Sequence, residues 1–487
     1  MPTLLTIPLE LLVSISSFLP TQDLASLRLT CNQIERSLYE WFSKEFFTKK
    51  QFMLTHPSLQ TLIDISKHAS FSQKLTHVII GTNIYEDIPM RFRDSQAATK
   101  FIQGLEDQRN LMSIGLDREM LTEAFERLVN LNTVGIRDFH STNRIRDGER
   151  ASWSSWGAPT VYRETGVQLQ FGRQSSSGFG GFGGTAERNN FPARVFSTLL
   201  HALGKAGRTP SEVEVLLRIS GLPDYAFSLP NYLLPTADPI LQSLTTLLLN
   251  VNLNPQSYHT HSNGNPCDPN AGRALRHFLS HTPNLKHLRL NFEKHMVAHN
   301  AQFLQWLSEP VPDTSSQTRD YFDPAPIALP FLKQLNFGQL IVVPAILTDV
   351  ITKFASTLED LSLWRMGLDA HALPPPGHKP NYWADVFTKL STIPQLELTH
   401  LMVGMLQQDH LHVGFKQEGD DKAPRLLKRE YSGKKMDKFL EEISRDVSVD
   451  WPERPSVLPF EDEDEEMADE DEEEEDEDED DEDDDEA

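Results

Sequence analysis

The stretch RALRHFLSHTPNLKHLRLNF, residues 273–292, decides the fold. Residues 275–281 have the apolar spacing of an amphipathic helix, and after a short break leucines occupy positions 285, 288 and 290. The alternation of these leucines with polar residues predicts a β-strand with one buried face. A unit of helix, short break and apolar strand that recurs along a chain predicts parallel strands joined by right-handed crossovers.

The same leucine spacing recurs along the chain. Eight segments have Leu, an aliphatic residue three positions on, and an aliphatic residue or Phe two positions further, where roughly two to four would arise by chance. Helical stretches precede four of them, at residues 120–129, 275–281, 345–355 and 383–390. Residues 213–219, preceded by a helical stretch at 196–206, fit a further strand that lacks the motif. The eight segments are Leu75-Val78-Ile80, Leu111-Ile114-Leu116, Leu131-Val134-Ile136, Leu244-Leu247-Leu249, Leu285-Leu288-Leu290, Leu332-Leu335-Phe337, Leu358-Leu361-Leu363 and Leu398-Leu401-Val403.

This pattern resembles that of leucine-rich repeats, which implies an α/β solenoid with parallel strands. In that family an Asn three residues after the last motif position bonds to neighbouring backbone, and only Asn83 and Asn252 stand at such positions. Motif starts lie from 20 to over 100 residues apart, whereas regular repeats are spaced by about 20–29 residues. We therefore expect an irregular solenoid with insertions. The alternative is a non-repetitive α/β sheet domain.

Composition divides the chain into four parts. We expect a helical module at residues 1–49, a leucine-rich-repeat-like body at 50–415, a basic linker at 416–460 and an acidic tail at 461–487. Within the body, stretches near 140–190, 254–272 and 309–326 have little apolar periodicity and predict loop insertions. Long loops on a rigid scaffold are where recognition residues concentrate.

The first fifty residues predict three short helices. Pro8 is preset for a first helical turn, and Glu10 in the same turn complements the helix dipole. Pro20 ends this helix and Thr21 caps a second one, while apolar residues at intervals of three and four between 34 and 46 predict a longer third helix. So small a bundle cannot bury all its apolar side chains. The surplus predicts a surface that a partner covers.

These residues resemble the F-box over positions 5–38. Thr30 stands where a Val is common in that family, Ile34 stands where it often has Trp, and residues 27–31 resemble the F-boxes of fungal proteins. The resemblance implies binding to a Skp-type adaptor and, through it, to a cullin. The alternative is a helical hairpin that merely caps the body. The positions that the resemblance assigns to adaptor binding are Pro8, Leu9, Glu10, Ile15, Leu19, Asp23, Leu24, Leu27 and Cys31.

Charge is concentrated at the C-terminal end. Of the 71 acidic residues 24 lie between 461 and 486, and the remaining 47 nearly balance the 45 basic ones. Such a run cannot bury apolar surface, so we expect it to be disordered. Two distant cysteines predict neither a disulfide framework nor a cysteine zinc site and fit a reducing compartment. With no signal peptide or membrane span expected, we predict an intracellular protein of the cytoplasm or nucleus.

Motifs that could carry chemistry are weak. Residues 178–183 match G-x-G-x-x-G, but their serine- and glycine-rich setting favours a flexible linker over a dinucleotide site. His277 and His281, and also His295 and His299, stand four apart without the third ligand that a zinc site needs. We therefore expect no cofactor, no metal and no catalytic residue.

The hypothesis that fits these observations is a non-catalytic substrate receptor of an SCF-type ubiquitin ligase. Its F-box binds the adaptor, and its body binds a protein substrate that the sequence does not identify. The alternative is a chaperone or scaffold that holds a basic protein, such as a histone, on the acidic tail. A basic cluster follows the body, but it has few aromatic residues and precedes the acids, which disfavours nucleic acid. It comprises Lys422, Arg425, Lys428, Arg429, Lys434, Lys435 and Lys438.

Removal of residues 461–487 should leave the melting temperature nearly unchanged or slightly higher, because a run of like charges repels itself and contributes no core. Differential scanning calorimetry of the full and shortened chains measures this. A shortened chain that melts many degrees lower would show that the tail is docked structure.

Overall fold

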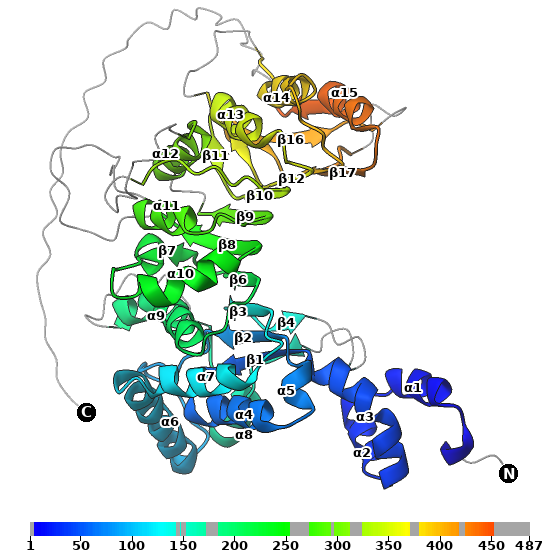
Figure 1. The fold of residues 1–487 in the computed structure, drawn as a ribbon, viewed down its shortest axis with the longest axis vertical. Helices are drawn as coiled ribbons and strands as arrows, with labels where there is room; N and C mark the ends of the chain where they lie inside the picture. The colour runs from blue at the N-terminus through cyan, green and yellow to red at the C-terminus, as the bar shows by residue number, and fades with distance from the viewer. Residues whose placement is uncertain are drawn as a thin grey trace, which may run out of the picture. The chain divides into compact units, whose positions relative to one another are not determined.

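The computed structural model describes residues 4–142, 147, 152–171, 184–253, 272–293, 297–311, 324–370, 379–417 and 424–451. These residues contain a sheet of eleven strands, drawn in Figure 1. Its strands are Lys49–Met53 (β1), His77–Gly81 (β2), Thr133–Arg137 (β3), Glu212–Leu216 (β6), Leu222–Pro223 (β7), Thr246–Asn252 (β8), His287–Phe292 (β9), Gln334–Gly338 (β10), Asp360–Trp364 (β12), His400–Gly404 (β14) and Lys428–Ser432 (β17).

The strands lie side by side in the order in which they occur in the chain. The order is β1-β2-β3-β6-β8-β9-β10-β12-β14-β17, and β7 pairs with β8. Neighbours from β1 to β14 pair in parallel, and β17 pairs antiparallel with β14. This succession of parallel strands is that of a solenoid-like α/β body, which confirms the predicted fold class.

On β8 and β9 buried residues alternate with half-buried ones. On β8, Leu247 and Leu249 are fully buried, whereas Leu248 between them is half-buried. Because neighbouring strands are in register, the second and fourth residues of the strands form two continuous apolar rows. We call the opposite side of the sheet, which carries the first, third and fifth residues of each strand, the open face.

Helices cover the apolar rows. Phe196 and Leu200 of one helix lie with Val134 of β3 and Val213 of β6 around a small apolar cavity. Helices α9 and α10 contact each other, and Figure 1 shows α9, α10 and α11 beside strands β6 to β9. The helices between the strands are His56–Lys67 (α4), Phe71–Lys74 (α5), Ser95–Ser113 (α6), Leu116–Arg127 (α7), Gly184–Lys205 (α9), Leu234–Ser243 (α10), Arg273–Ser280 (α11), Val297–Ser308 (α12), Pro344–Phe354 (α13) and Tyr382–Leu390 (α14). A 3-10 helix, Asp224–Phe227, follows β7.

Seven of the eight leucine motifs lie on strands, and one does not. Leu111 is in α6 and Leu116 begins α7, so the prediction of a strand at residues 111–116 is wrong. Gly115 between these helices has φ of 75°, a conformation that lets the chain turn from one helix into the next. The motif spacing alone does not distinguish a strand from the junction of two helices.

Three adjacent strands end in the same turn. Gln339, Arg365 and Met405 follow β10, β12 and β14 and have φ of 56°, 56° and 54°. The backbone therefore closes these turns, and no Asn side chain is required. The N–H of each residue donates to a carbonyl oxygen of the neighbouring segment: Gln339 to Trp364 at 3.0 Å, Arg365 to Gly404 at 2.9 Å and Met405 to Leu427 at 2.8 Å.

The segment predicted to be loop at residues 140–190 contains structure that closes the sheet beside β1. It includes Ser141–Thr142 (β4), Ser152–Trp153 (β5) and Ala158–Thr165 (α8), and its Trp156 N–H donates to the Gln51 carbonyl oxygen of β1 at 2.8 Å. The Ser155 hydroxyl donates to Asn83 Oδ1 at 2.5 Å. Asn83 thus holds this insertion rather than a repeat turn. Residues 254–271 and 312–323 of the other two predicted insertions lie outside the described residues.

The predicted basic linker at 416–460 is wrong where the structure describes it. Strand β17 extends the main sheet, the helix Met436–Asp446 (α15) contacts α14, and the strand Val447–Val449 (β18) pairs with Leu411–Phe415 (β16). Phe439, Leu440 and Ile443 of α15 are buried, so this segment covers the end of the core. The described residues up to Asp450 form one compact unit. β16 and β18 belong to a smaller sheet with Ile341–Val342 (β11), Gly367–Leu368 (β13) and Gln407–Gln408 (β15).

Leu247→Ala should lower the free energy of unfolding by about 2–5 kcal/mol, because it leaves a cavity in a fully packed row. Leu248→Ala, one residue along the same strand on the open face, should cost about 1 kcal/mol or less. Urea denaturation of the two variants measures the difference. Equal losses would contradict the assignment of the two faces.

Candidate functional site: the N-terminal apolar surface and the open face

The three N-terminal helices form a small module with its own core. They are Leu9–Ser17 (α1), Thr21–Arg28 (α2) and Asn32–Phe47 (α3), preceded by a 3-10 turn at Leu4–Thr6. Apolar side chains from all three helices are buried against one another, and Arg28 lies 3.5 Å over the ring of Phe42. The buried set is Leu12, Leu24, Ile34, Leu38 and Phe46.

A second set of apolar side chains in the same module faces solvent. Phe18 is 81% exposed and Leu29 is 86% exposed, values far above those of core residues. Five more large apolar residues, Leu4, Leu5, Leu9, Leu11 and Ile15, are between 43% and 55% exposed. We call these seven residues the N-terminal apolar surface. So many exposed apolar side chains in a stretch of 26 residues indicate a surface that a partner covers.

The structure places the predicted adaptor-binding residues in three environments. Pro8, Leu9, Glu10, Ile15 and Asp23 are exposed, and Leu19, Leu27 and Cys31 are partly buried against the core of the module. Leu24 is 0% exposed, so its prediction as a contact residue is at odds with its burial. The resemblance did not assign adaptor binding to the five other residues of the N-terminal apolar surface, which are Leu4, Leu5, Leu11, Phe18 and Leu29. Sequence spacing marks them as apolar but does not say which side of so short a helix faces inward.

The module joins the body without a linker. Helix α3 ends at Phe47 and β1 begins at Lys49. The ring of Phe47 stacks on Phe71 of α5 with 3.8 Å between centroids, and the Thr48 carbonyl oxygen accepts from the N–H of His77 at 3.0 Å. Asp147, from the insertion after β3, accepts hydrogen bonds from the N–H and hydroxyl of Thr21 at 2.6 and 2.7 Å. These contacts anchor the module on the first strands of the body.

Residues 4–38 match the model of the F-box domain. The match covers α1 and α2 and the first part of α3. This chain is an F-box protein. No curated protein sequence matches it. A solved structure described as "Crystal structure of Rad7 and Elc1 complex in yeast" is similar over 76% of this chain and 82% of that chain, at 9% identity and a TM-score of 0.21, a value at which the likeness supports no conclusion.

The open face of this F-box protein carries a buried ion pair. Arg137 Nη2 lies 2.9 Å from Glu214 Oε2, and His77 Nε2 lies 3.4 Å from the same oxygen. Burial alone would raise the pKa of Glu214, but the His77 imidazole and the Arg137 guanidinium lower it to about 2. Burial lowers the pKa of His77 itself, so at neutral pH the carboxylate of Glu214 balances the charge of Arg137.

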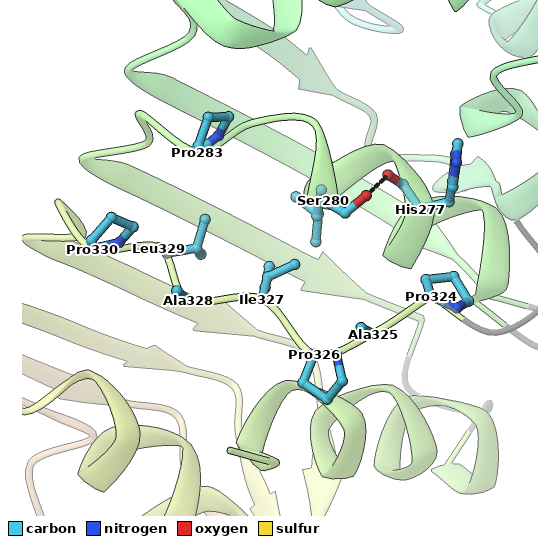
Figure 2. Close-up of a pocket in the computed structure, with 11 residues that line it drawn as sticks. His277, Ser280, Pro283, Pro324, Ala325, Pro326, Ile327, Ala328, Leu329 and Pro330 are labelled. Carbon is cyan, nitrogen blue, oxygen red and sulfur yellow. Dashed lines mark hydrogen bonds between the residues drawn. The ribbon is translucent and has the colours of Figure 1, made fainter. Parts of the chain in front are cut away.

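A cavity of about 190 Å³ lies between α11 and residues 324–330. Figure 2 shows the residues that line it. Its lining is largely apolar and includes Pro283, Pro326 and Ile327. The Ser280 hydroxyl at its wall donates to the His277 carbonyl oxygen at 2.7 Å. The cavity therefore suits an apolar side chain better than a polar substrate.

The histidine pair of α11 forms a local contact. His277 and His281 have ring centroids 4.9 Å apart, and His281 Nδ1 lies 2.7 Å from Asp238 Oδ1. His295 and residues 178–183 lie outside the described residues, as does the acidic tail. Among the residues described, no group of three or more His, Cys, Asp or Glu is placed to hold a metal ion. No described helix is long and apolar enough to cross a membrane.

Three cations of the predicted basic cluster are paired within the folded end of the body. Arg429 Nη1 lies 3.3 Å from Asp446 Oδ2, Lys428 Nζ lies 2.5 Å from Glu430 Oε2, and Arg425 pairs with Asp450. Part of the cluster's charge is therefore neutralised locally, which weakens the interpretation of these residues as a free basic patch. The basic partner predicted for the acidic tail remains a prediction.

Glu214→Gln should lower the free energy of unfolding at pH 7 by about 3 kcal/mol, because it removes the carboxylate that pairs with the buried Arg137 guanidinium. Glu212→Gln is the matched control on the same strand, since the Glu212 carboxylate accepts from the neutral Thr133 hydroxyl, at 2.9 Å, and should cost about 1 kcal/mol or less.

The Glu214 contribution has a defined pH dependence. The pKa of the Glu214 carboxyl is about 2 in the folded protein, against an ordinary value of 4.5. Ionised Glu214 therefore stabilises the fold above pH 4.5, and this stabilisation is lost as the pH falls toward 2. Urea denaturation of the wild type and Glu214→Gln should therefore converge as the pH falls from 4.5 toward 2. A constant difference would show that the ion pair is not its source.

Proposed function

We propose that this F-box protein is the substrate-recognition subunit of an SCF-type ubiquitin ligase. The observation that carries the proposal is that the F-box match and the N-terminal apolar surface fall on the same residues. A Skp-type adaptor is the partner that covers this surface, and a cullin is reached through the adaptor. The function places the protein in the cytoplasm or nucleus.

In this role the chain supplies proximity rather than a nucleophile. Holding a substrate beside a loaded conjugating enzyme turns an encounter between two proteins into a reaction within one complex, which by itself accelerates transfer. The body serves this role through its open face, where half-buried polar and apolar side chains stand side by side on parallel strands, among them Leu248, Arg289, Trp364 and Met402. The anchoring of α3 on α5 and β1 supports the proposal, because it fixes the adaptor-binding module to the body that holds the substrate.

A double variant, Phe18→Ser with Leu29→Ser, should weaken co-purification of the Skp-type adaptor by about tenfold or more. The loss of two exposed apolar anchors removes contact area at the interface without altering the core of the module. Adaptor and cullin recovered with the tagged full chain are measured by quantitative mass spectrometry, and the melting temperature is measured in parallel.

Tyr232→Ser is the matched control, because Tyr232 is as exposed as Leu29, at 86%, but lies in the body. It should leave adaptor recovery unchanged. Wild-type recovery with the double variant, or no adaptor with the wild-type chain, would overturn the proposal. Leu24→Asp is unsuitable for this test, since a charge at a fully buried position would unfold the module.

A further inference from the structure

Two polar side chains on β9 have no hydrogen-bond partner among the described residues. Arg289 and Asn291 occupy the third and fifth positions of the strand, so both belong to the open face. Both are half-buried, and the Nε of Arg289 is shielded from solvent without an acceptor. A buried donor left without an acceptor costs roughly 1–3 kcal/mol, and more when the group is charged. The free protein therefore holds the Nε of Arg289 at a cost.

The neighbours of Arg289 and Asn291 are either apolar or already engaged. Leu248 of β8 and Asn336 of β10 stand beside Arg289 in the register of the sheet. Asn336 Oδ1 lies 2.7 Å from His287 Nε2. Asn250, which stands beside Asn291, donates its amide to the Leu217 carbonyl oxygen at 2.7 Å. The terminal nitrogens of Arg289 and the carboxamide of Asn291 thus remain available to an outside group.

The carboxylate near Arg289 is also engaged. Arg289 interacts electrostatically with Glu214 and Arg137. The Glu214 carboxylate is 2.9 Å from Arg137 and forms its ion pair there. Burial lowers the pKa of Arg289, opposed by the charge of Glu214, yet a guanidinium stays protonated at neutral pH. Arg289 is therefore charged but forms no ion pair among the described residues.

We propose that Arg289 and Asn291 bind an acidic segment of a protein partner, with a side-chain carboxylate on Arg289 and a backbone peptide group on Asn291. The proposal deepens the proposed function, on which it rests, by naming the chemistry of the substrate. A carboxylate fits the two-pronged arrangement of the guanidinium donors. A carboxamide offers one donor and one acceptor, the pair that a peptide group requires. Leu248 and Trp364 on the same face supply apolar contact for neighbouring side chains.

The surroundings favour a carboxylate over a phosphate. The carboxylates of Glu214 and Glu212 both stand on β6 of the same face, and Glu214 interacts electrostatically with Arg289. A second negative charge on the ligand would add to the repulsion from these carboxylates. A monoanion satisfies Arg289 with less repulsion.

The experiment selects random 12-residue peptides displayed on phage against the immobilised full-length protein. Wild type should enrich peptides with Asp or Glu at a fixed position. Synthetic versions of the enriched peptide with Glu, Gln or phosphoserine at that position are then titrated by fluorescence anisotropy. Glu should bind about tenfold or more tighter than Gln, since a charge-assisted contact is lost. Tighter binding of phosphoserine than of Glu would overturn the choice of a carboxylate.

Three variants locate the site. Arg289→Gln should lower the affinity for the Glu peptide by about tenfold or more. Arg163→Gln, which removes an exposed arginine from α8, should leave this affinity unchanged. Asn291→Asp should weaken binding of the peptide as well and raise the melting temperature, because the new carboxylate, two residues along the strand on the same face, can pair with the Arg289 guanidinium. Enrichment without acidic residues, or equal binding by Arg289→Gln and wild type, would overturn the inference.

The same samples separate this inference from the proposed function. Adaptor recovery with Arg289→Gln should equal that of the wild type, because the open face is not part of the N-terminal apolar surface. Normal adaptor recovery without acidic peptide selection refutes the inference alone. Acidic peptide binding without adaptor recovery refutes the ligase role alone.

Discussion

The register of the parallel strands is the constraint on which the rest of the structure depends. Because β1 to β14 pair in register, the second and fourth residues of the strands line up as rows that are apolar from β2 onward, and the helices between the strands can cover them. A slip of one residue would turn these rows to the other face. The same register sets Glu214, Leu248, Arg289 and Asn336 beside one another on neighbouring strands, although they are far apart in sequence. The register of the strands therefore determines both the core and the open face.

A sheet built in this way has two edges that need protection. Beside β1 the chain returns from the insertion after β3, and Trp156 bonds to the strand through its backbone. At the other end β17 adds an antiparallel strand, rich in charged residues, while α15 covers the apolar rows. Both closing segments were expected to be loop or linker. Their function as closures explains why they carry structure in stretches where the leucine motif is absent.

The sequence predicted what depends on local periodicity. The apolar alternation located seven of the strands, and helical spacing located the three N-terminal helices and five helices of the body, which are α7, α9, α11, α13 and α14. It failed where tertiary contacts decide. Leu24 and Phe18 are both apolar residues of a short helical module, yet only packing shows that Leu24 is buried and Phe18 is exposed. Periodicity could not predict the surroundings of Arg289 either. Only the folded sheet shows that Arg289 interacts with Glu214 and that Glu214 is already paired with Arg137.

The N-terminal apolar surface and the Arg289 site differ in what a partner would relieve, exposed apolar area at the first and an unpaired charge at the second. They should therefore respond differently to salt. The N-terminal apolar surface exposes Phe18, Leu29 and five other apolar side chains to water, so its association is driven by removal of apolar area and is strengthened by salts that favour burial. The Arg289 site instead holds a charged guanidinium without an ion pair, so binding of an anion there would be weakened as salt screens the charge. In the proposed function each surface would therefore respond to a different property of its partner, apolar area for the adaptor and negative charge for the substrate.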